Sequence, residues 1–267
     1  MAMARTERPT TERDGSATQE QTWRVERAKW DALAPKRLSP EDAALPAPDF
    51  GAYARQSISM TGIADFLGDL AGRQVLDYGC GRGITATLLA KSGARVSAFD
   101  LSPAMVQATR ERAHLNGVEI EVTVAAGENL PYDDSAFDVV FGRAILHHLA
   151  QARAGPELHR VLRPDGRAAF SEPLGTNPVL AFVRDHVPYR AKNPRGADRP
   201  LTYRDLEAWG RGFRRYEYTE VELLSMLERA FGHHQRFPRL RRVDERLLAR
   251  IPALRRLCRY VTLRMVK

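Results

Sequence analysis

The sequence predicts an α/β fold in which a doubly wound, mostly parallel seven-stranded sheet carries helices on both faces. Two observations lead to this prediction. From residue 73 onward, short apolar runs alternate with segments of helical periodicity, which is typical of parallel strands joined by helices. A glycine-rich turn also follows the first apolar run directly. We expect the last two apolar runs, near the end of the chain, to be partly antiparallel strands of the same sheet.

The chain before the sheet is expected to form a helical segment over residues 22–70. Residues 1–21 are rich in Thr, Glu, Arg and Ser and predict a disordered tail. Apolar residues at helical spacing predict helices over 23–34 and 52–70, with a proline-containing linker between them. The aromatic residues Trp23, Trp30 and Tyr53 either close a pocket or pack in the core, and the sequence leaves both roles open.

Five strands and their connecting helices follow in order. Pro103 at a first helical position, with Ser102 as its N-cap, marks one helix start clearly. The expected strands are residues 74–78, 95–100, 119–125, 137–142 and 167–171, and the expected helices are residues 84–92, 103–114 and 157–162.

The end of the chain completes a sheet domain that we assign to residues 71–267. Prolines and charges predict an irregular insertion at about 174–212, with a short helix around Leu206 and Trp209 near its end. Alternating apolar and polar residues predict strands at 213–221 and 259–266, with a helix over 222–231.

The net charge of +8 is concentrated in the last third of the chain. Residues 184–267 carry 21 Lys and Arg against 10 Asp and Glu, which leaves the rest slightly acidic. Such a surplus fits a nucleic-acid or membrane-surface contact, a pocket for an anionic substrate, or a solvated arginine-rich face. The third interpretation is favoured, because the chain holds only five lysines and an arginine bias also occurs without any binding role.

The composition predicts a protein with no membrane span, no metal site and no disulfide. No apolar run approaches the roughly 18 residues that cross a bilayer, and the first residues lack the apolar core of a secretory signal peptide. Cys80 and Cys258 lie far apart and lack the spacing of metal ligands. We therefore expect a cytoplasmic location.

The most specific feature is the run from Val75 to Gly83, V-L-D-Y-G-C-G-R-G, in which a strand ends in three glycines at alternate positions before a helix. Glycines let the backbone approach a ligand, and the helix N-terminus offers free N–H groups. Asp100 ends the next strand, where an acid can accept hydrogen bonds from the hydroxyls of a ribose. A dinucleotide-binding loop requires glycine at position 84, and Ile84 stands there instead.

This run resembles the first motif of class I S-adenosylmethionine (SAM)-dependent methyltransferases. Later strings resemble the ubiquinone/menaquinone-type subgroup of small-molecule methyltransferases, namely Ala98–Met105, Leu130–Tyr132, Phe137–Val140, Leu146–Leu149 and Arg160–Gly166. The resemblance covers residues 70 to 175 approximately and implies a Rossmann-like sheet with SAM as cofactor. It also implies that the helices of residues 22–70 form a lid over the pocket and that the insertion at about 174–212 is substrate-shaping.

The resemblance also implies which residues surround the cofactor. Near the methionine part, Asp77 supplies negative charge; Asp100 binds the ribose, and Leu101 and Met105 flank the adenine. One position departs from the family pattern, since Ala126 stands where an Asp contacts the adenine amino group. The backbone at Gly127 or the carboxylate of Glu128 must replace it. The full predicted set is Asp77, Gly79, Cys80, Gly81, Gly83, Asp100, Leu101, Met105, Gly127, Glu128 and Arg143.

Methyl transfer requires alignment of a nucleophile and, for a hydroxyl or a protonated amine, removal of a proton. His147 and His148 follow the fourth strand at the edge of the sheet where ligands bind. Adjacent helical residues point about 100° apart, so we expect only one of them to face the pocket. We favour His148 as the base, with packing of the helix as the alternative. Glu172, which ends the fifth strand, is a second candidate, to orient a histidine or bind a substrate amine.

We predict transfer to an O or N atom of a small organic molecule, in specialised metabolism. A C-methyltransferase for an activated ring or quinone-like lipid is the close alternative, and an RNA methyltransferase is the second. No RNA-binding module is recognisable, so we expect a small-molecule acceptor and no nucleic acid. A SAM-binding protein without catalysis is a further alternative. The oligomeric state stays open, a homodimer included.

Overall fold

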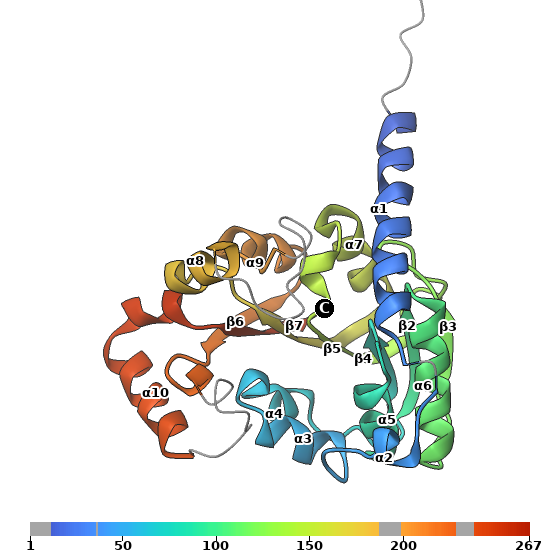
Figure 1. Cartoon of the computed structure of the whole chain (residues 1–267), viewed down its shortest axis with the longest axis horizontal. Coiled ribbons are helices and arrows are strands. Elements are labelled where there is room, and N and C mark those ends of the chain that lie inside the picture. Colours follow the sequence, from blue (N-terminus) through green and yellow to red (C-terminus); the bar gives the residue numbers. More distant parts are fainter. Residues whose placement is uncertain (1–11, 36, 187–198, 228–237) are drawn as a thin grey trace, which may run out of the picture.

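A seven-stranded sheet with helices on both faces forms the centre of the computed structural model (Figure 1). The structure describes residues 12–35, 37–186, 199–227 and 238–267. The strand order is β3-β2-β1-β4-β5-β7-β6. The strands are β1 (Gln74–Tyr78), β2 (Arg95–Asp100), β3 (Glu121–Val124), β4 (Phe137–Arg143), β5 (Leu162–Pro173), β6 (Arg215–Val221) and β7 (Tyr260–Val266). The predicted fold class is confirmed.

The first five strands are parallel, and β7 inserts antiparallel between β5 and β6. Successive strands add outward from β1 in both directions, with β2 on one side and β4 on the other. The chain therefore reverses its direction of growth at β1. Loops at the carboxyl ends of β1 and β4 diverge there, and such a point is where doubly wound sheets bind ligands.

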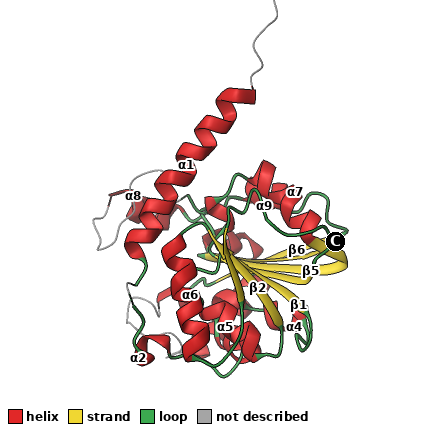
Figure 2. Ribbon diagram, turned by 90° about the vertical axis from the view of Figure 1, so that its right-hand side faces the viewer, coloured by secondary structure: helices red, strands yellow, loops and turns green. Residues whose placement is uncertain are grey.

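Helices lie on both faces of the sheet (Figure 2). Alternation along each strand divides the core next to the sheet into two clusters, one on each face. In β1, Leu76 and Tyr78 belong to the cluster that includes α7 and α9, whereas Val75 belongs to the cluster that includes α3 to α6. The helices are α1 (Glu12–Leu33), α2 (Pro40–Ala43), α3 (Phe50–Gln56), α4 (Ile63–Leu67), α5 (Ile84–Lys91), α6 (Pro103–Leu115), α7 (Gln151–Val161), α8 (Pro178–His186), α9 (Tyr203–Trp209) and α10 (Pro238–Arg250), with 3-10 turns η1 (Ile58–Met60), η2 (Leu146–His148) and η4 (Pro252–Leu257).

The N-terminal segment differs from the sequence prediction in two ways. Helix α1 begins at Glu12, so residues 12–21 are helical rather than a disordered tail, while residues 1–11 lie outside the described residues. The helix predicted over 52–70 is instead divided into α3, η1 and α4. Gly62, with φ of 77°, interrupts the predicted helix, because its left-handed backbone conformation does not fit a right-handed helix.

Further differences lie in the second half of the chain. Helix α7 begins at Gln151, six residues before its predicted start, and α8 forms within the insertion expected to be irregular. The helix predicted over 222–231 is wrong for residues 222–224, which form a bend; residues 225–227 form a 3-10 turn, and the remainder lies outside the described residues. The reason is Asp244 of α10, a buried carboxylate that accepts hydrogen bonds from the amides of residues 223, 224 and 225. The amides of residues 223 and 224 are thereby satisfied without a helix.

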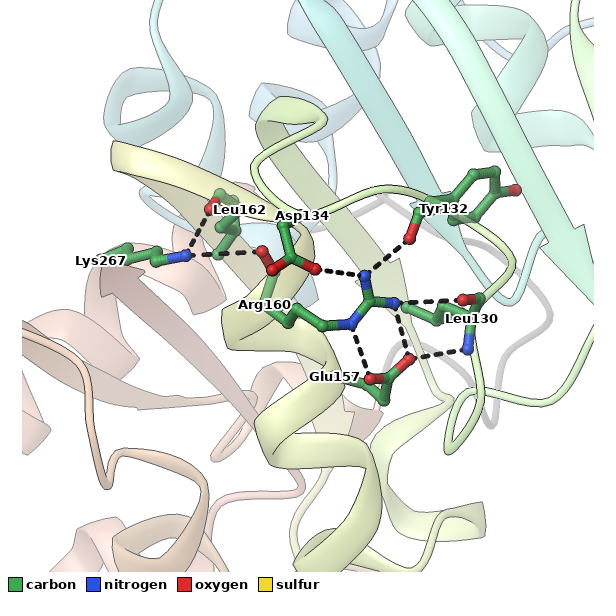
Figure 3. Close-up of polar contacts among 7 residues, drawn as sticks. All are labelled: Leu130, Tyr132, Asp134, Glu157, Arg160, Leu162 and Lys267. Carbon is green, nitrogen blue, oxygen red and sulfur yellow. Dashed lines mark hydrogen bonds and ion pairs between the residues drawn. The ribbon is translucent and has the colours of Figure 1, made fainter.

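One arginine holds the loop before β4 to α7 (Figure 3). The guanidinium of Arg160 donates to both oxygens of Glu157 at 2.8 and 2.9 Å, to Asp134 at 2.9 Å, and to the carbonyls of Leu130 and Tyr132 at 3.1 and 2.7 Å. Glu157 in turn accepts the Leu130 amide at 2.8 Å. This network fixes the loop that follows Gly127 and Glu128 on the way to β4.

Within the described residues, no helix is both long and apolar enough to span a bilayer.

Candidate active site

A cavity of about 430 Å³ opens at the carboxyl ends of β1, β2 and β4, with α1 along one side. Its floor comes from the glycine loop and the strand ends, and its cover comes from one face of α1. Eight of the predicted cofactor residues line it, namely Gly79, Gly81, Asp100, Leu101, Met105, Gly127, Glu128 and Arg143. From α1 it is lined by Thr22, Trp23, Glu26, Trp30 and Leu33.

The loop after β1 requires glycine at its three glycine positions for different physical reasons. All three have positive φ, at 78°, 50° and 77° for Gly79, Gly81 and Gly83. A Cβ at Gly83 would lie 2.7 Å from the Cα of Thr109 in α6, so this glycine permits close helix packing. A Cβ at Gly81 would meet nothing within 4 Å and would occupy the open pocket. Gly81 therefore keeps space for a ligand, whereas Gly83 faces away from it.

Cys80 likewise faces α6 rather than the pocket. Its thiol is buried and lies 3.4 Å from the Thr109 hydroxyl. Burial raises its pKa well above the ordinary value. Neither Cys80 nor Gly83 lines the cavity, so a contact between the cofactor and the Cys80 side chain receives no support from this geometry.

Asp77 lies at the end of β1 directly before the glycine loop and is almost completely buried. Among the described residues, its Oδ2 atom has no hydrogen-bond partner. Burial raises the pKa of Asp77 to about 7, and the nearby charge of Asp100 adds to this, while an amide hydrogen bond from Ala86 opposes it. A buried carboxylate with one unsatisfied oxygen is costly. A cationic donor beside the loop would satisfy it.

Asp100 joins the first two loops of the site. Its Oδ2 accepts the Gly81 amide at 2.9 Å and its Oδ1 accepts the Ser102 amide at 2.9 Å. Burial raises the pKa of Asp100, and the hydrogen bonds from Ser102, Gly81 and Leu101 oppose that rise. The carboxylate thus shapes the glycine loop as well as facing the pocket.

Helix α1 is held on this site by polar contacts that the sequence analysis did not identify. Asp31 accepts the Ala104 amide at 3.2 Å and also the Ser102 hydroxyl, at the start of α6. Arg27 donates to the carbonyl of Leu101 at 3.2 Å. Nothing in the local sequence signals these pairs, because their partners lie more than seventy positions away.

The predicted adenine end is occupied by protein contacts. Glu128 accepts the Ala150 amide at 2.9 Å through Oε1 and the indole N–H of Trp23 at 3.2 Å through Oε2. The carbonyl of Gly127 accepts the Tyr78 hydroxyl at 2.6 Å. The two groups predicted to replace the missing Asp at Ala126 therefore already bind other parts of the protein, and their contact with a cofactor stays a prediction.

The two histidines of η2 point to different surroundings, as predicted. His147 Nδ1 lies 2.7 Å from Glu172 Oε2, and both side chains are buried. Glu172 also accepts the amides of Ile145 and Leu146 at 2.8 and 3.0 Å, so it holds the turn after β4. His148, by contrast, lines the cavity and packs edge-on against Trp30 with ring centroids 5.5 Å apart.

Glu172 orients His147 rather than His148. The acid beside His148 is Glu26 of α1, whose Oε2 lies 3.6 Å from His148 Nδ1. Glu26 could not be predicted as part of the site, because its spacing from Trp23 and Trp30 indicates only that the three residues lie on one face of the same helix.

Arg143, at the end of β4, lines the cavity and donates a hydrogen bond to the Tyr53 hydroxyl of α3. Its guanidinium also lies over the Tyr53 ring, 5.7 Å from the ring centroid. Among the described residues no carboxylate lies within ion-pair distance of Arg143. Nor do these residues contain three or more His, Cys, Asp or Glu side chains grouped so that they could hold a metal ion.

A glycine loop at the reversal point of the sheet, with an acid ending the next strand, defines a nucleoside-binding α/β domain. Residues 76–170 match the family described as methyltransferase domain. This match agrees with the resemblance to class I SAM-dependent methyltransferases that the sequence motifs predict.

Three curated relatives are similar in sequence to part of this chain. A ubiquinone biosynthesis O-methyltransferase of Alkalilimnicola ehrlichii is 34% identical over 157 residues, which cover 57% of this chain and 60% of the relative. A demethylmenaquinone methyltransferase of Clavibacter sepedonicus is 39% identical over a stretch that covers 45% of this chain and 49% of the relative. A glycine/sarcosine/dimethylglycine N-methyltransferase of Actinopolyspora halophila is 39% identical over a stretch that covers 39% of this chain and 19% of the relative. The chain thus spans between a fifth and three fifths of these relatives.

Solved structures match over more of the chain. A geranyl diphosphate C-methyltransferase from Streptomyces coelicolor has a TM-score of 0.53 at 18% identity and covers 76% of this chain and 75% of that one. The [4+2]-cyclase SpnF has a TM-score of 0.53 at 19% identity, and the match covers 81% of this chain and 82% of that one. These similarities confirm the fold, and the second illustrates that one fold supports different chemistries.

Proposed function

We propose that the protein binds SAM in the cavity under α1 and transfers its methyl group to an O or N atom of a small organic molecule. The observation that carries the proposal is that the glycine loop and the His148 imidazole line one cavity, while the unsatisfied carboxylate of Asp77 is buried directly before that loop. The domain family matched over residues 76–170 supports the same reaction class.

The residues present fit this cofactor. Asp77 Oδ2 is a buried acceptor in need of a donor, which suits the ammonium group at the methionine end. Gly81 leaves room for a ligand, and Asp100 carries a carboxylate at the ribose position. Leu101 and Met105 give apolar walls for the adenine. When bound, SAM would supply an electrophilic methyl group on a sulfonium.

The protein's own residues then have three tasks. The cover formed by Trp23, Trp30 and Leu33 limits water in the pocket, which strengthens the electrostatic interactions inside it. His148 accepts the proton of the acceptor hydroxyl or ammonium. Glu172 and His147 hold the turn that carries His148 through their three hydrogen bonds.

We further propose that α1 to α4 form the lid and residues 71–267 the catalytic domain, with residues 174–212 shaping the acceptor site. On this proposal the acceptor is a small molecule and not nucleic acid, and the protein acts in the cytoplasm. Two free, buried thiols, Cys80 and Cys258, support the last point. C-methylation and RNA methylation stay alternatives without a specific observation in their favour.

Two measurements test the proposal. Calorimetry with S-adenosylhomocysteine (SAH) should reveal micromolar binding, and absence of binding would refute it. Formation of SAH from SAM should then be followed with a panel of phenols, amines and carboxylic acids as acceptors. With an accepted substrate, His148→Ala should lower turnover by about 10²- to 10⁴-fold. A loss of only a few-fold would assign His148 to packing, and retention on RNA with methyl incorporation would favour the RNA alternative.

A further inference from the structure

We propose that Glu26 of α1 is a positioning residue that pairs with His148 and makes its imidazole more basic, so that docking of α1 completes the proton acceptor. This inference rests on the proposed function, since it assigns a partner to the histidine of that site.

The pair is partly shielded from solvent. Glu26 Oε2 lies 3.6 Å from His148 Nδ1, an ion-pair distance, and the two side chains are 17% and 9% exposed. Both residues line the same cavity. An opposite charge at this distance favours the protonated imidazole, more strongly here than at an open surface. Because Nδ1 faces Glu26, exchange of a proton with an acceptor falls to Nε2 on the other side of the ring.

Trp30 fixes the geometry of the pair. Its indole N–H donates to Glu26 Oε2 at 2.9 Å, and its ring meets the His148 ring edge-on at 87°. The carboxylate is therefore held from its own helix, one turn away, while the imidazole packs against the same indole. Three residues at positions 26, 30 and 148 form one contact cluster.

The carboxylate reaches the pocket only because α1 docks. The same helix is anchored to the start of α6 through Asp31 and to the carbonyl of Leu101 through Arg27. Leu101 directly follows Asp100, the predicted ribose ligand. The cofactor loop and the histidine partner are thus tied to one helix, which couples cofactor binding to the basicity of His148.

Other ionisable groups also surround His148. The His147 ring lies 4.1 Å away between centroids, with Glu172 behind it. Glu128 and Arg143 line the same cavity, and Lys29 of α1 lies over the Trp30 ring. A substitution of Glu26 by Gln leaves all of these unchanged. It also keeps an oxygen that can accept the Trp30 indole, so it removes the charge with little change of shape.

The experiment measures the titration of His148 by NMR in the full chain labelled at histidine, with its resonance assigned from the His148→Asn variant. Glu26→Gln should lower the pKa of His148 by about one pH unit. The matched control is Glu20→Gln on the same helix, where Glu20 forms an exposed ion pair with Arg24, and it should leave the titration unchanged. Far-UV circular dichroism establishes that both variants fold.

An unaltered His148 titration in Glu26→Gln would overturn the inference. A decrease of the same size in Glu20→Gln would also overturn it, because it would reflect the charge of the helix as a whole. Calorimetry with SAH on the same samples distinguishes failure of the Glu26–His148 pair from failure of the proposed function. SAH binding with an unaltered titration refutes the pair alone, whereas no SAH binding refutes the proposed function whatever the titration.

Discussion

The Gly81 amide donates a hydrogen bond of 2.9 Å to the Asp100 carboxylate. The loop after β1 is thereby fastened to the end of β2, and the two motifs that are separate in the sequence form one floor under the cavity. The same carboxylate accepts the Ser102 amide, at the N-cap of α6. Substitutions in this floor should therefore affect ligand binding and loop order differently, depending on which hydrogen bonds they remove.

Asp100→Ala should weaken SAH binding by about 1–3 kcal/mol, because a charge-assisted hydrogen bond to the ribose and the anchor of the Gly81 amide are both lost. Asp100→Asn keeps an oxygen that can accept the Gly81 amide and should weaken binding less. Calorimetry measures both affinities. An unchanged affinity in Asp100→Ala would contradict the ribose role.

The affinity for SAH should depend on pH through Asp77. Burial raises its pKa to about 7 in the free protein, and a bound ammonium would lower it. Affinity should then be complete above about pH 7 and fall below it by at most about tenfold per pH unit, since the protonated acid must first lose its proton. Calorimetry in buffers of different ionisation enthalpy should detect proton release near pH 6. Asp77→Asn should bind weakly and without this pH dependence, and a flat profile in the natural protein would contradict the role of Asp77.

Two glycines of the loop should respond differently to alanine. Gly83→Ala places a Cβ 2.7 Å from the backbone of Thr109 and should destabilise the fold by about 2–5 kcal/mol. Gly81→Ala meets no protein atom within 4 Å, so it should cost only about 1–2 kcal/mol, from its positive φ. Its methyl group should instead obstruct SAH. Urea unfolding and calorimetry separate the two effects, and equal losses of stability would contradict the assignment.

Arg160→Ala should lower the free energy of unfolding at pH 7 by about 1–3 kcal/mol, because it removes the guanidinium that donates to Glu157 and to two carbonyls. The side-chain hydrogen bond from Arg160 lowers the pKa of Glu157. A lowered folded-state pKa contributes stability above the unfolded pKa that is lost as the pH falls through the folded one. The difference between Arg160→Ala and the natural protein should therefore shrink below about pH 4. Arg153→Ala on the exposed side of α7 is the control and should change little.

The succession of strands along the chain and the position of the ligand loop could be predicted from the sequence, because both depend on local patterns. An apolar run that ends in glycines or in an acid, such as Asp77 or Asp100, can be identified in the sequence without knowing which strands pack beside it. The elements that were predicted wrongly were set by distant partners. Residues 222–224 bend instead of starting a helix because Asp244, about twenty positions later, accepts the amides of residues 223–225.

The methyltransferase domain, the loop glycines and the pair of candidate histidines could be predicted from the sequence alone. The packing of distant elements sets three further features: His148 faces the cavity, Glu172 pairs with His147, and Glu26 lies beside His148. The two groups of features differ in the sequence distance between the residues that interact. Glycine conformation and strand burial are properties of adjacent residues, whereas the environment of a histidine depends on which helix packs over it, and α1 meets η2 across more than a hundred residues of chain.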